Sequence, residues 1–439
     1  MYFGQVLDKS RFENSLYQFF ELIIHKYSTL LDKALCKKSE PKELRVFKSK
    51  YNFRLKDKNY YLEMTQKILL QPIKLGDVAL KNKLVMAPLT RCRADYQTGI
   101  PTDLHVEYYT QRASAGLVVS EAAWIHPRGH SYLGAAGIYN KDQVKGWKKV
   151  TQSVHDKGGK IFCQLFHGGR SAHPDQIGGK RALAPSAIAV EGDFMAWTGS
   201  AMKRIGEFPP DEMTKDDIKE LIEATENAGK LALEAGFDGV ELHNANGYIF
   251  DEFIKDHTNR RTDEYGGNIE NRSRLTLDVL GRLAKVWGPG RVGVKLSPVG
   301  RYLDMYDSDP KTHIRYLARK ISELNLAYIC YMEYDGTPNP VRGGKGTEQI
   351  PNCAKEFRSS TSIQLMTNGG LSFEEGERRV KEGEADLVCM GAKYVSNPDL
   401  LERYKNGWPL TPPDPNTFYT PGPQGYTDYP RYDQTHKTH

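Results

Sequence analysis

The sequence predicts a single (β/α)8 barrel of the α/β class, a TIM barrel, with a long insertion after its third strand and a helical extension at the N-terminus. From about residue 70, eight short apolar, β-branched runs alternate with amphipathic helical patterns. Polar residues and glycines follow several of these runs, at the strand ends where barrel enzymes carry their chemistry. No GxGxxG motif follows the first run, so a closed barrel fits better than a doubly wound open sheet.

The apolar runs predict strands that are buried on both faces, because the runs are nearly continuous rather than alternating. Helical patterns fill the intervals between them. The predicted strands are 84–89, 117–123, 161–166, 240–243, 292–297, 328–332, 363–366 and 387–390. The predicted helices include 141–157, 214–235, 271–287, 312–324, 373–382 and 398–405.

Three segments depart from this alternation. Residues 72–82 predict a short hairpin that closes the bottom of the barrel. Residues 167–213 are rich in Gly and Pro and too long for a simple connection, which is typical of an active-site lid. Within that insertion, His167 and His173 are expected to face solvent or to cap helix ends. After Trp408, frequent prolines predict an irregular wrap rather than a helix.

Residues 1–63 form the first of three predicted divisions, followed by the barrel, 64–430, and a short tail, 431–439. This first segment holds 13 of the 61 Lys and Arg but only 8 of the 55 Asp and Glu, so it carries most of the net charge of +6. Apolar residues between positions 16 and 31 recur at helical spacing and predict one amphipathic helix. That helix could pack on the barrel, be partly disordered, or bind a membrane surface or a partner.

The composition of the remaining chain argues against several classes of protein. It is nearly neutral, so we expect no nucleic-acid binding. No apolar run approaches the roughly 18 residues of a membrane helix, and no secretory signal is evident. The six cysteines are scattered without a CxxC pair, which argues against an iron–sulfur cluster, a zinc site or disulfides. We therefore expect a cytoplasmic protein without a metal, in which Cys92 is a small buried thiol.

The most informative stretch is His-Asn-Ala-Asn-Gly-Tyr at 243–248, which closes a predicted strand. His243 and the Asn246 amide can bind and polarise a carbonyl oxygen. The Tyr248 phenol, with an ordinary pKa of about 10, can supply a proton. Taken alone, a His-x-x-Asn pair is also typical of plain hydrogen-bonded structure, and Tyr248 could be a core tyrosine.

Two further signals point to an anionic ligand. The loops after the last two strands carry Gly369, Gly370, Gly391 and Lys393, where this fold usually binds phosphate, although glycine turns are common in any barrel. Lys295 stands within a buried apolar run and must face something polar. Its partner could be a carboxylate or an anionic cofactor ring.

Together these features resemble the old yellow enzyme family of FMN-dependent ene-reductases, and in particular its 12-oxophytodienoate reductases. The resemblance runs from about residue 70 to residue 430 and leaves out residues 1–63. It rests on Met-Ala-Pro-Leu-Thr-Arg at 86–91, Gln-Leu-Phe-His-Gly-Gly-Arg at 164–170, the stretch 243–248, Thr-Asp-Glu-Tyr-Gly-Gly-Asn-Ile-Glu-Asn-Arg at 262–272, Ser-Asn-Pro-Asp-Leu at 396–400 and Thr-Phe-Tyr at 417–419.

The resemblance implies FMN bound across the top of the barrel. Thr90 would hydrogen-bond the flavin O4, Gln164 would read the pyrimidine edge, and Lys295 would face N1 and O2. The other implied cofactor contacts are Ala87, Pro88 and Ala122 along the ring, His243 beside it, and Gly369, Gly370, Gly391 and Lys393 at the phosphate.

The implied activity is that of an NADPH dehydrogenase or ene-reductase acting on a small α,β-unsaturated carbonyl compound, oxylipin-like enones among them. NADPH would reduce the flavin, and hydride would pass from the flavin N5 to the β-carbon of the substrate. His243 and Asn246 would bind the carbonyl, Tyr248 would donate the proton, and Tyr419 would line the substrate pocket. The alternatives are a flavin-free Schiff-base lyase using Lys295 and a non-enzymatic flavin-binding protein.

The chain departs from the family pattern at Lys295 and Lys393, where arginine is usual. Lysine keeps the charge but loses the planar fork, so the exchange is not conservative. We therefore expect FMN to bind more weakly than is typical. The sequence does not fix the physiological substrate, the preference for NADPH over NADH, or the choice between monomer and homodimer.

Overall fold

The computed structural model describes residues 67–300, 302–333 and 353–432. The helix predicted near the N-terminus and nearly all of the predicted tail lie outside the described residues. The predicted boundary between residues 63 and 64 therefore stays a prediction.

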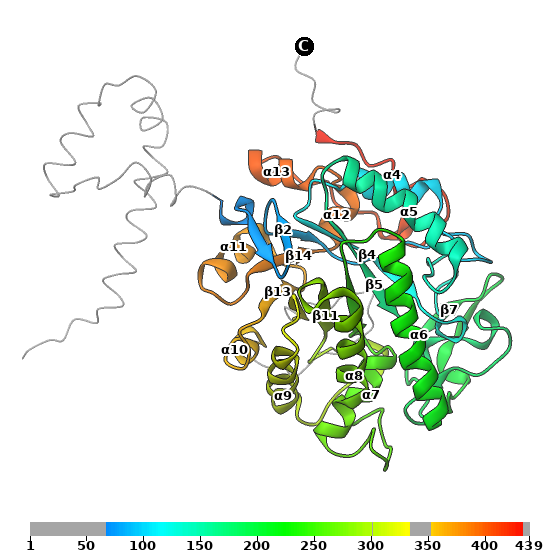
Figure 1. The fold of residues 1–439 in the computed structure, drawn as a ribbon. Coiled ribbons are helices and arrows are strands. Elements are labelled where there is room, and N and C mark those ends of the chain that lie inside the picture. The colour runs from blue at the N-terminus through cyan, green and yellow to red at the C-terminus, as the bar shows by residue number, and fades with distance from the viewer. Residues whose placement is uncertain (1–66, 301, 334–352, 433–439) are drawn as a thin grey trace, which may run out of the picture. The chain divides into compact units, whose positions relative to one another are not determined.

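Eight parallel strands close into one barrel, which confirms the predicted fold class (Figure 1). They follow one another around the barrel in chain order, and the last strand pairs with the first. The strands are β3 (Leu84–Met86), β4 (Leu117–Trp124), β5 (Ile161–Phe166), β10 (Gly239–Asn244), β11 (Val292–Leu296), β12 (Tyr328–Met332), β13 (Gln364–Asn368) and β14 (Leu387–Met390). Each lies where the sequence predicts a strand.

The largest difference between prediction and structure is at β3, which ends at Met86 rather than at residue 89. The Ala87 amide still donates to the Met390 carbonyl at 2.9 Å. Pro88 follows, and it has no N–H to continue the ladder. The chain therefore leaves the barrel wall here and runs along the top of the barrel.

The hairpin predicted at 72–82 is present and closes the barrel floor. It consists of β1 (Ile73–Leu75) and β2 (Val78–Leu80), which pair antiparallel. Leu75, Val78 and Leu80 belong to the same apolar cluster as the inward-facing Phe162 and Tyr328. The lower half of the barrel is therefore filled with side chains, and any ligand must enter from the other end.

Helices surround the barrel (Figure 1). Asn140, Thr214 and Asn268 each accept backbone N–H groups at a helix start, as expected for N-cap residues. The helices are α4 (Asp103–Gln111), α5 (Lys141–Asp156), α6 (Lys215–Glu234), α7 (Ile249–Ile254), α8 (Ile269–Trp287), α9 (Pro310–Glu323), α10 (Cys353–Arg358), α11 (Phe373–Lys381), α12 (Ala392–Ser396) and α13 (Leu400–Asn406). The six predicted helices are all among them. The sequence did not predict α4, which has little amphipathic contrast, or α7, α10 and α12, which are too short for a helical period to emerge.

The insertion at 167–213 is a small folded unit rather than a bare loop. Phe194 within it packs edge-on against Tyr302 at 5.5 Å. Arg261 fastens it to the body by donating to the carbonyls of Pro185 (3.1 Å) and Met213 (2.6 Å). Its elements are η3 (Gly169–Ser171), η4 (Pro174–Gln176), β6 (Leu183–Ala184), β7 (Met195–Trp197), β8 (Met202–Arg204), η5 (Ile205–Glu207) and β9 (Asp211–Glu212).

Between Trp408 and residue 431 the described chain is irregular as predicted, apart from the short turn η8 (Pro415–Thr417). Two guanidinium groups from the loop after β3 hold it. Arg93 donates to the Thr417 carbonyl at 2.8 Å, and Arg91 donates to the Gly425 carbonyl at 2.7 Å. Among the helices of the described residues, none has the length and apolar character needed to cross a membrane.

Candidate active site

The barrel opens at the carboxyl ends of its strands into a cleft of about 660 Å³. The cleft brings together every predicted substrate-binding residue and five of the predicted flavin contacts, His243 being counted in both groups. Its lining consists of Pro88, Leu89, Thr90, Ala122, Tyr132, Gln164, Phe166, His243, Asn246, Tyr248, Tyr302 and Tyr419.

The chain turns sharply after β10, through two residues in the left-handed region. Asn246 has φ 60° and Gly247 has φ 75°. Asparagine is one of the few residues with a side chain that adopts this conformation readily. At Gly247 a Cβ would lie 2.9 Å from the carbonyl oxygen of Tyr302, so glycine is required. The turn places both Asn246 and Tyr248 in the lining of the cleft.

The Tyr248 ring is held on two sides. It meets His243 edge-on at 5.0 Å and Phe166 edge-on at 4.6 Å. Its hydroxyl lies 3.0 Å from the Tyr132 hydroxyl, which in turn lies 3.1 Å from the Tyr302 hydroxyl. Tyr248 is therefore a buried phenol with a fixed direction and a polar tip that reaches the cleft.

Tyr132 and Tyr302 are site residues that the sequence did not predict. Burial, together with the neighbouring phenols, raises the pKa of Tyr132 well above its ordinary value, so its hydroxyl stays neutral. Tyr132 comes from the loop after β4, and Tyr302 begins the turn η7 (Tyr302–Asp304) after β11. In the sequence, each of these two tyrosines is an aromatic residue in a loop that follows a barrel strand. No recognisable motif surrounds either of them, so this was the one signal that could have identified them.

A buried carboxylate lies inside the barrel, near the cleft. Glu241 accepts hydrogen bonds from the Gln164 amide nitrogen at 2.7 Å and from the Tyr328 hydroxyl at 2.9 Å. Burial raises the pKa of Glu241, while the positive charge of Lys295 and these two hydrogen bonds oppose that rise. Lys295 was singled out in the sequence because it is a charged residue within an apolar run. Glu241 also stands within such a run, so the same criterion would have identified it.

Lys295 is buried and pairs in register with His243, so it stands at the level of the cleft floor. If the polar partner of Lys295 is a carboxylate, as one of the two interpretations has it, Glu241 is the candidate. The same position beside His243 also suits an anionic ring in the cleft, so the two interpretations are compatible.

The three glycines after β13 and β14 differ in how closely other atoms pack against their backbone. A Cβ at Gly369 would lie 2.1 Å from the carbonyl oxygen of Glu333, so close backbone packing demands glycine there. Gly370 faces open space at φ 87°, and Gly391 has ordinary room beside Leu89. Only Gly370 and Gly391 therefore leave space in which a ligand could approach the backbone.

Lys393 joins the two loops. Its Nζ donates to the Leu371 carbonyl at 2.8 Å. Partial burial lowers the pKa of Lys393, and the charge of Glu374 opposes this shift. The ammonium group thus lies near both glycine turns, where a phosphate would find positive charge.

Tyr419 reaches the cleft from the C-terminal wrap. Its ring lies nearly parallel to that of Tyr132, with 6.5 Å between centroids, and it is half exposed. The neighbouring Phe418 carbonyl accepts from Arg91 at 3.0 Å and from Arg93 at 2.8 Å. The wrap therefore forms one rim of the cleft.

The remaining predictions concern residues away from the lining. His167 accepts the Gly169 N–H at 3.1 Å, and burial lowers its pKa to about 3. His173 accepts the Asp175 N–H at 3.1 Å. Both histidines therefore cap turns, as expected. Cys92 is buried, which confirms the prediction of a small buried thiol, and burial raises the pKa of that thiol to about 12.

The residues present fit FMN on chemical grounds. The Gln164 amide nitrogen donates to Glu241, and its carbonyl oxygen can accept an imide N–H. Pro88 and Ala122 add apolar side chains to the cleft lining, and Thr90 adds a hydroxyl. FMN, with its planar ring, polar pyrimidine edge and phosphate, matches these groups together with the Lys393 ammonium group at the glycine turns.

Comparisons with known proteins agree with this site. Residues 68–411 match the model of the NADH:flavin oxidoreductase / NADH oxidase family. A probable flavin mononucleotide-dependent alkene reductase of Leishmania infantum is 41% identical over 365 residues, which cover 83% of this chain and 97% of that protein. The structure of the old yellow enzyme homologue from Zymomonas mobilis is 40% identical with a TM-score of 0.78, over 82% of this chain and 99% of that one.

Morphinone reductase in complex with tetrahydroNAD is also similar, at 37% identity and a TM-score of 0.78, over 84% of this chain and 99% of that one. These findings do not support a flavin-free Schiff-base lyase or a non-enzymatic flavin protein. The chain belongs to the NADH:flavin oxidoreductase / NADH oxidase family, and within it to the FMN-dependent ene-reductases of the old yellow enzyme type.

Proposed function

We propose that this protein uses NADPH to reduce the carbon–carbon double bond of α,β-unsaturated carbonyl compounds. The observation that carries the proposal is the shared cleft: His243, Asn246 and Tyr248 line the same space as Thr90 and Gln164. One group of residues suits a carbonyl compound, and the other suits a flavin ring beside it. FMN, when bound, supplies the hydride that it has taken from the nicotinamide.

His243 and Asn246 bind the substrate through its carbonyl oxygen. As hydride reaches the β-carbon, electron density moves to that oxygen and an enolate forms. Two N–H donors aimed at the oxygen stabilise this charge, and the loss of one such donor typically slows a reaction by roughly 10²–10³-fold. The edge-on packing of His243 against Tyr248 holds the imidazole in place.

Tyr248 donates the proton that completes the reduction. The enolate collapses as its α-carbon takes the phenolic proton, so one hydride and one proton are added across the double bond. The phenolate left on Tyr248 can accept a hydrogen bond from the Tyr132 hydroxyl, which lies 3.0 Å away. That contact stabilises the charge until solvent returns the proton.

The cofactor roles implied by the resemblance are proposed for the same residues. Thr90 bonds the flavin carbonyl edge, and Gln164 the pyrimidine edge. Lys295 balances the negative charge that reduction brings, and Lys393 with Gly370 and Gly391 receives the phosphate. NADPH is the proposed electron source, and a direct comparison of NADPH with NADH as reductant tests that part separately.

Isotope labelling of the product tests the reaction. With 2-cyclohexenone in heavy water, deuterium should enter at the α-carbon only, because Tyr248 exchanges its proton with solvent. With 4-deuterated nicotinamide in ordinary water, deuterium should enter at the β-carbon only. Proton and deuterium NMR of cyclohexanone distinguishes the two positions.

The purified protein should also be yellow or become yellow with added FMN. A colourless protein that takes up no FMN would sink the proposal. Reduction of the carbonyl to an alcohol, with the double bond kept, would assign the cleft to a different reaction.

A further inference from the structure

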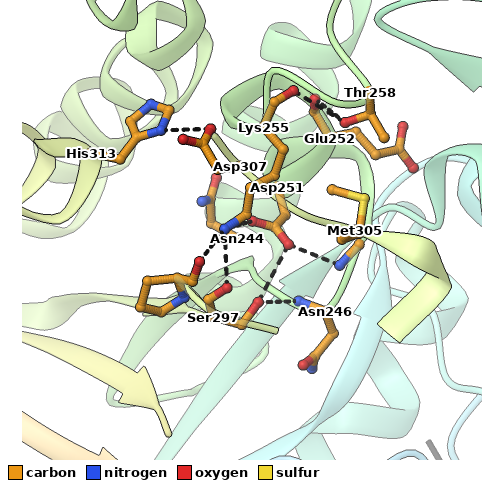
Figure 2. Close-up of polar contacts among 12 residues, drawn as sticks. Asn244, Asn246, Asp251, Glu252, Lys255, Thr258, Ser297, Met305, Asp307 and His313 are labelled. Carbon is orange, nitrogen blue, oxygen red and sulfur yellow. Dashed lines mark hydrogen bonds and ion pairs between the residues drawn. The ribbon is translucent and has the colours of Figure 1, made fainter. Parts of the chain in front are cut away.

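A buried hydrogen-bond network lies behind the turn that carries Asn246 (Figure 2). The Asn246 N–H donates to the Ser297 hydroxyl at 2.7 Å, and the Gly247 N–H donates to Asp251 Oδ2 at 2.9 Å. The Ser297 hydroxyl in turn donates to the same Asp251 oxygen at 3.3 Å. Two consecutive backbone N–H groups of the turn are therefore bound by two connected side chains.

Lys255 completes this network. Its Nζ lies 3.9 Å from Asp251 Oδ1 and donates to the carbonyls of Ser297 (3.2 Å) and Pro298 (2.7 Å). All three residues of the network are buried: the exposed fraction is at most 3% for Asp251, Lys255 and Ser297. The three side chains, here named the Asn246 brace, join α7 to the segment after β11.

The brace acts on a backbone conformation that needs support. Asn246 stands at φ 60°, a region that residues with a Cβ seldom adopt, and Gly247 follows in the same region. Among the described residues no backbone carbonyl accepts the N–H group of Asn246 or of Gly247. The brace supplies those acceptors, so it fixes the direction in which the Asn246 side chain leaves the turn.

The direction of the Asn246 side chain is set by its own backbone. Its amide lines the cleft, and its Oδ1 is buried without a hydrogen-bond partner among the described residues. No contact to that atom therefore holds the amide from the cleft side. Its orientation depends on the backbone behind it.

We propose that Ser297 and Asp251 are positioning residues for carbonyl binding, which hold the left-handed turn and thereby aim the Asn246 amide at the substrate oxygen. Lys255 supports them by balancing the Asp251 charge and by fixing the segment that carries Ser297. This inference rests on the proposed function, because it assigns the aim of Asn246 to a substrate carbonyl. A purely structural role would lower stability without a selective effect on ligands that need this amide.

The test compares Ser297→Ala with Thr258→Val, both in the full FMN-loaded chain. Thr258 is equally buried in the segment after α7, and its hydroxyl donates to the Glu252 and Lys255 carbonyls without contacting the turn (Figure 2). Each substitution removes one buried hydroxyl. Only the first removes the acceptor of the Asn246 N–H.

The first readout is binding of p-hydroxybenzaldehyde, titrated through the long-wavelength absorbance of a phenolate stacked on oxidised flavin. We expect Ser297→Ala to raise its Kd about tenfold or more, since the loss of a hydrogen bond from the Asn246 amide to a charged phenolate oxygen typically weakens binding by that factor. Thr258→Val should bind as the wild type does. Ser297→Thr, which keeps the hydroxyl, should restore binding.

The second readout is reoxidation of the flavin after reduction with dithionite. With 2-cyclohexenone, reoxidation in Ser297→Ala should slow by about ten- to a hundredfold, whereas reoxidation by dioxygen, which needs no carbonyl donors, should not change. Should Ser297→Ala fail to fold, Ser297→Cys keeps the volume while weakening the acceptor, and the same expectations apply to it.

Equal behaviour of Ser297→Ala and Thr258→Val in both readouts would overturn the inference while the proposed function stands. Equal slowing with enone and with dioxygen would also overturn it, because that result indicates a general disturbance of the flavin site. A wild-type protein that neither binds the phenol nor reacts with the enone would remove the proposed function and this inference together.

Discussion

The two ends of the proposed flavin site are built in different ways. At the β10 end, His243 and Tyr248 pack edge-on against each other, and the Asn246 brace holds the turn that carries Asn246. At the β13–β14 end, the chain offers Gly370, Gly391 and the long side chain of Lys393, whose Nζ donates to the Leu371 carbonyl. The first end suits a small neutral group that must be oriented, and the second suits a charged group that must be retained.

This difference predicts how each end responds to change. Side chains held by rigid networks lose function steeply when moved, because transition-state contacts depend on geometry. A point charge on a flexible stem tolerates exchange better, because Coulomb attraction falls gradually with distance. Substitutions at the β10 end should therefore affect rates most, and those at the β13–β14 end should affect cofactor affinity most.

The largest expected effect is that of Tyr248→Phe. Removal of the phenolic proton should slow enone reduction by roughly 10²–10⁴-fold, the usual contribution of a general acid. NADPH-driven reduction of the flavin should change little, because it needs no proton from this side chain. Single-turnover absorbance measurements of each half-reaction check this.

Tyr306→Phe is the matched control for Tyr248→Phe. Tyr306 stacks on His257 and is well exposed, outside the cleft lining. It should react as the wild type does. Retention of most of the enone activity in Tyr248→Phe would assign proton donation to another group.

A smaller effect is expected at Tyr132, which touches the proton donor rather than the substrate carbon. Loss of a hydrogen bond to a charged group typically costs about 1.5–3 kcal/mol, so Tyr132→Phe should slow enone reduction by about tenfold or more. Tyr302→Phe should act more weakly, since its hydroxyl reaches Tyr248 only through Tyr132. A larger loss in Tyr302→Phe than in Tyr132→Phe would mean that Tyr302 contacts the substrate itself.

Substitutions of Lys393 test the opposite end of the proposed flavin site. Lys393→Met should weaken FMN binding by about tenfold, as one charge–phosphate contact is worth roughly 1–2 kcal/mol in a partly solvated site. Lys393→Arg should bind FMN at least as tightly as the wild type, because the planar fork can grip two phosphate oxygens. Fluorescence quenching on reconstitution of the apoprotein measures both, and the rate of enone reduction at saturating FMN should stay unchanged.

Dialysis of the wild-type protein completes that experiment. We expect measurable release of FMN, because lysine stands where arginine is usual at two positions. Very tight retention would show that Lys295 and Lys393 serve the cofactor as well as arginine does.

The sequence predicted the two ends unequally, for physical reasons. The grouping of residues at the β10 end could be predicted because a buried strand that closes on His-Asn-Ala-Asn-Gly-Tyr carries these side chains close together in the sequence. Tyr132 and Tyr302 could not be predicted, since each sits in an irregular loop whose path depends on tertiary packing. The Asn246 brace was missed for a related reason: Asp251 and Ser297 are 46 positions apart and meet only because β10 and β11 pair in parallel.

The smallest expected effect concerns Glu252, a buried residue of α7 behind the β10 end. Burial raises its pKa to about 8, with the charge of Arg170 and a hydrogen bond from the Arg170 N–H opposing the rise. In the unfolded chain this carboxyl ionises near its ordinary pKa of about 4.3, so between that value and about 8 the native state keeps a proton that the unfolded state has lost. Stability should therefore fall as the pH rises through this window.

Glu252→Gln should flatten that dependence, because the amide carries no proton to lose. Between about pH 6.5 and pH 8.5 the wild type should lose about 2 kcal/mol more of its free energy of unfolding than the variant, a difference of a few degrees in Tm. His167 does not confound the comparison, because it is neutral in the native state of both proteins and therefore adds the same pH dependence to each. Identical pH dependence of Tm in the two proteins would mean that Glu252 is already ionised at neutral pH, held by Arg170, and that the β10 end rests on an ion pair rather than on a protonated carboxyl.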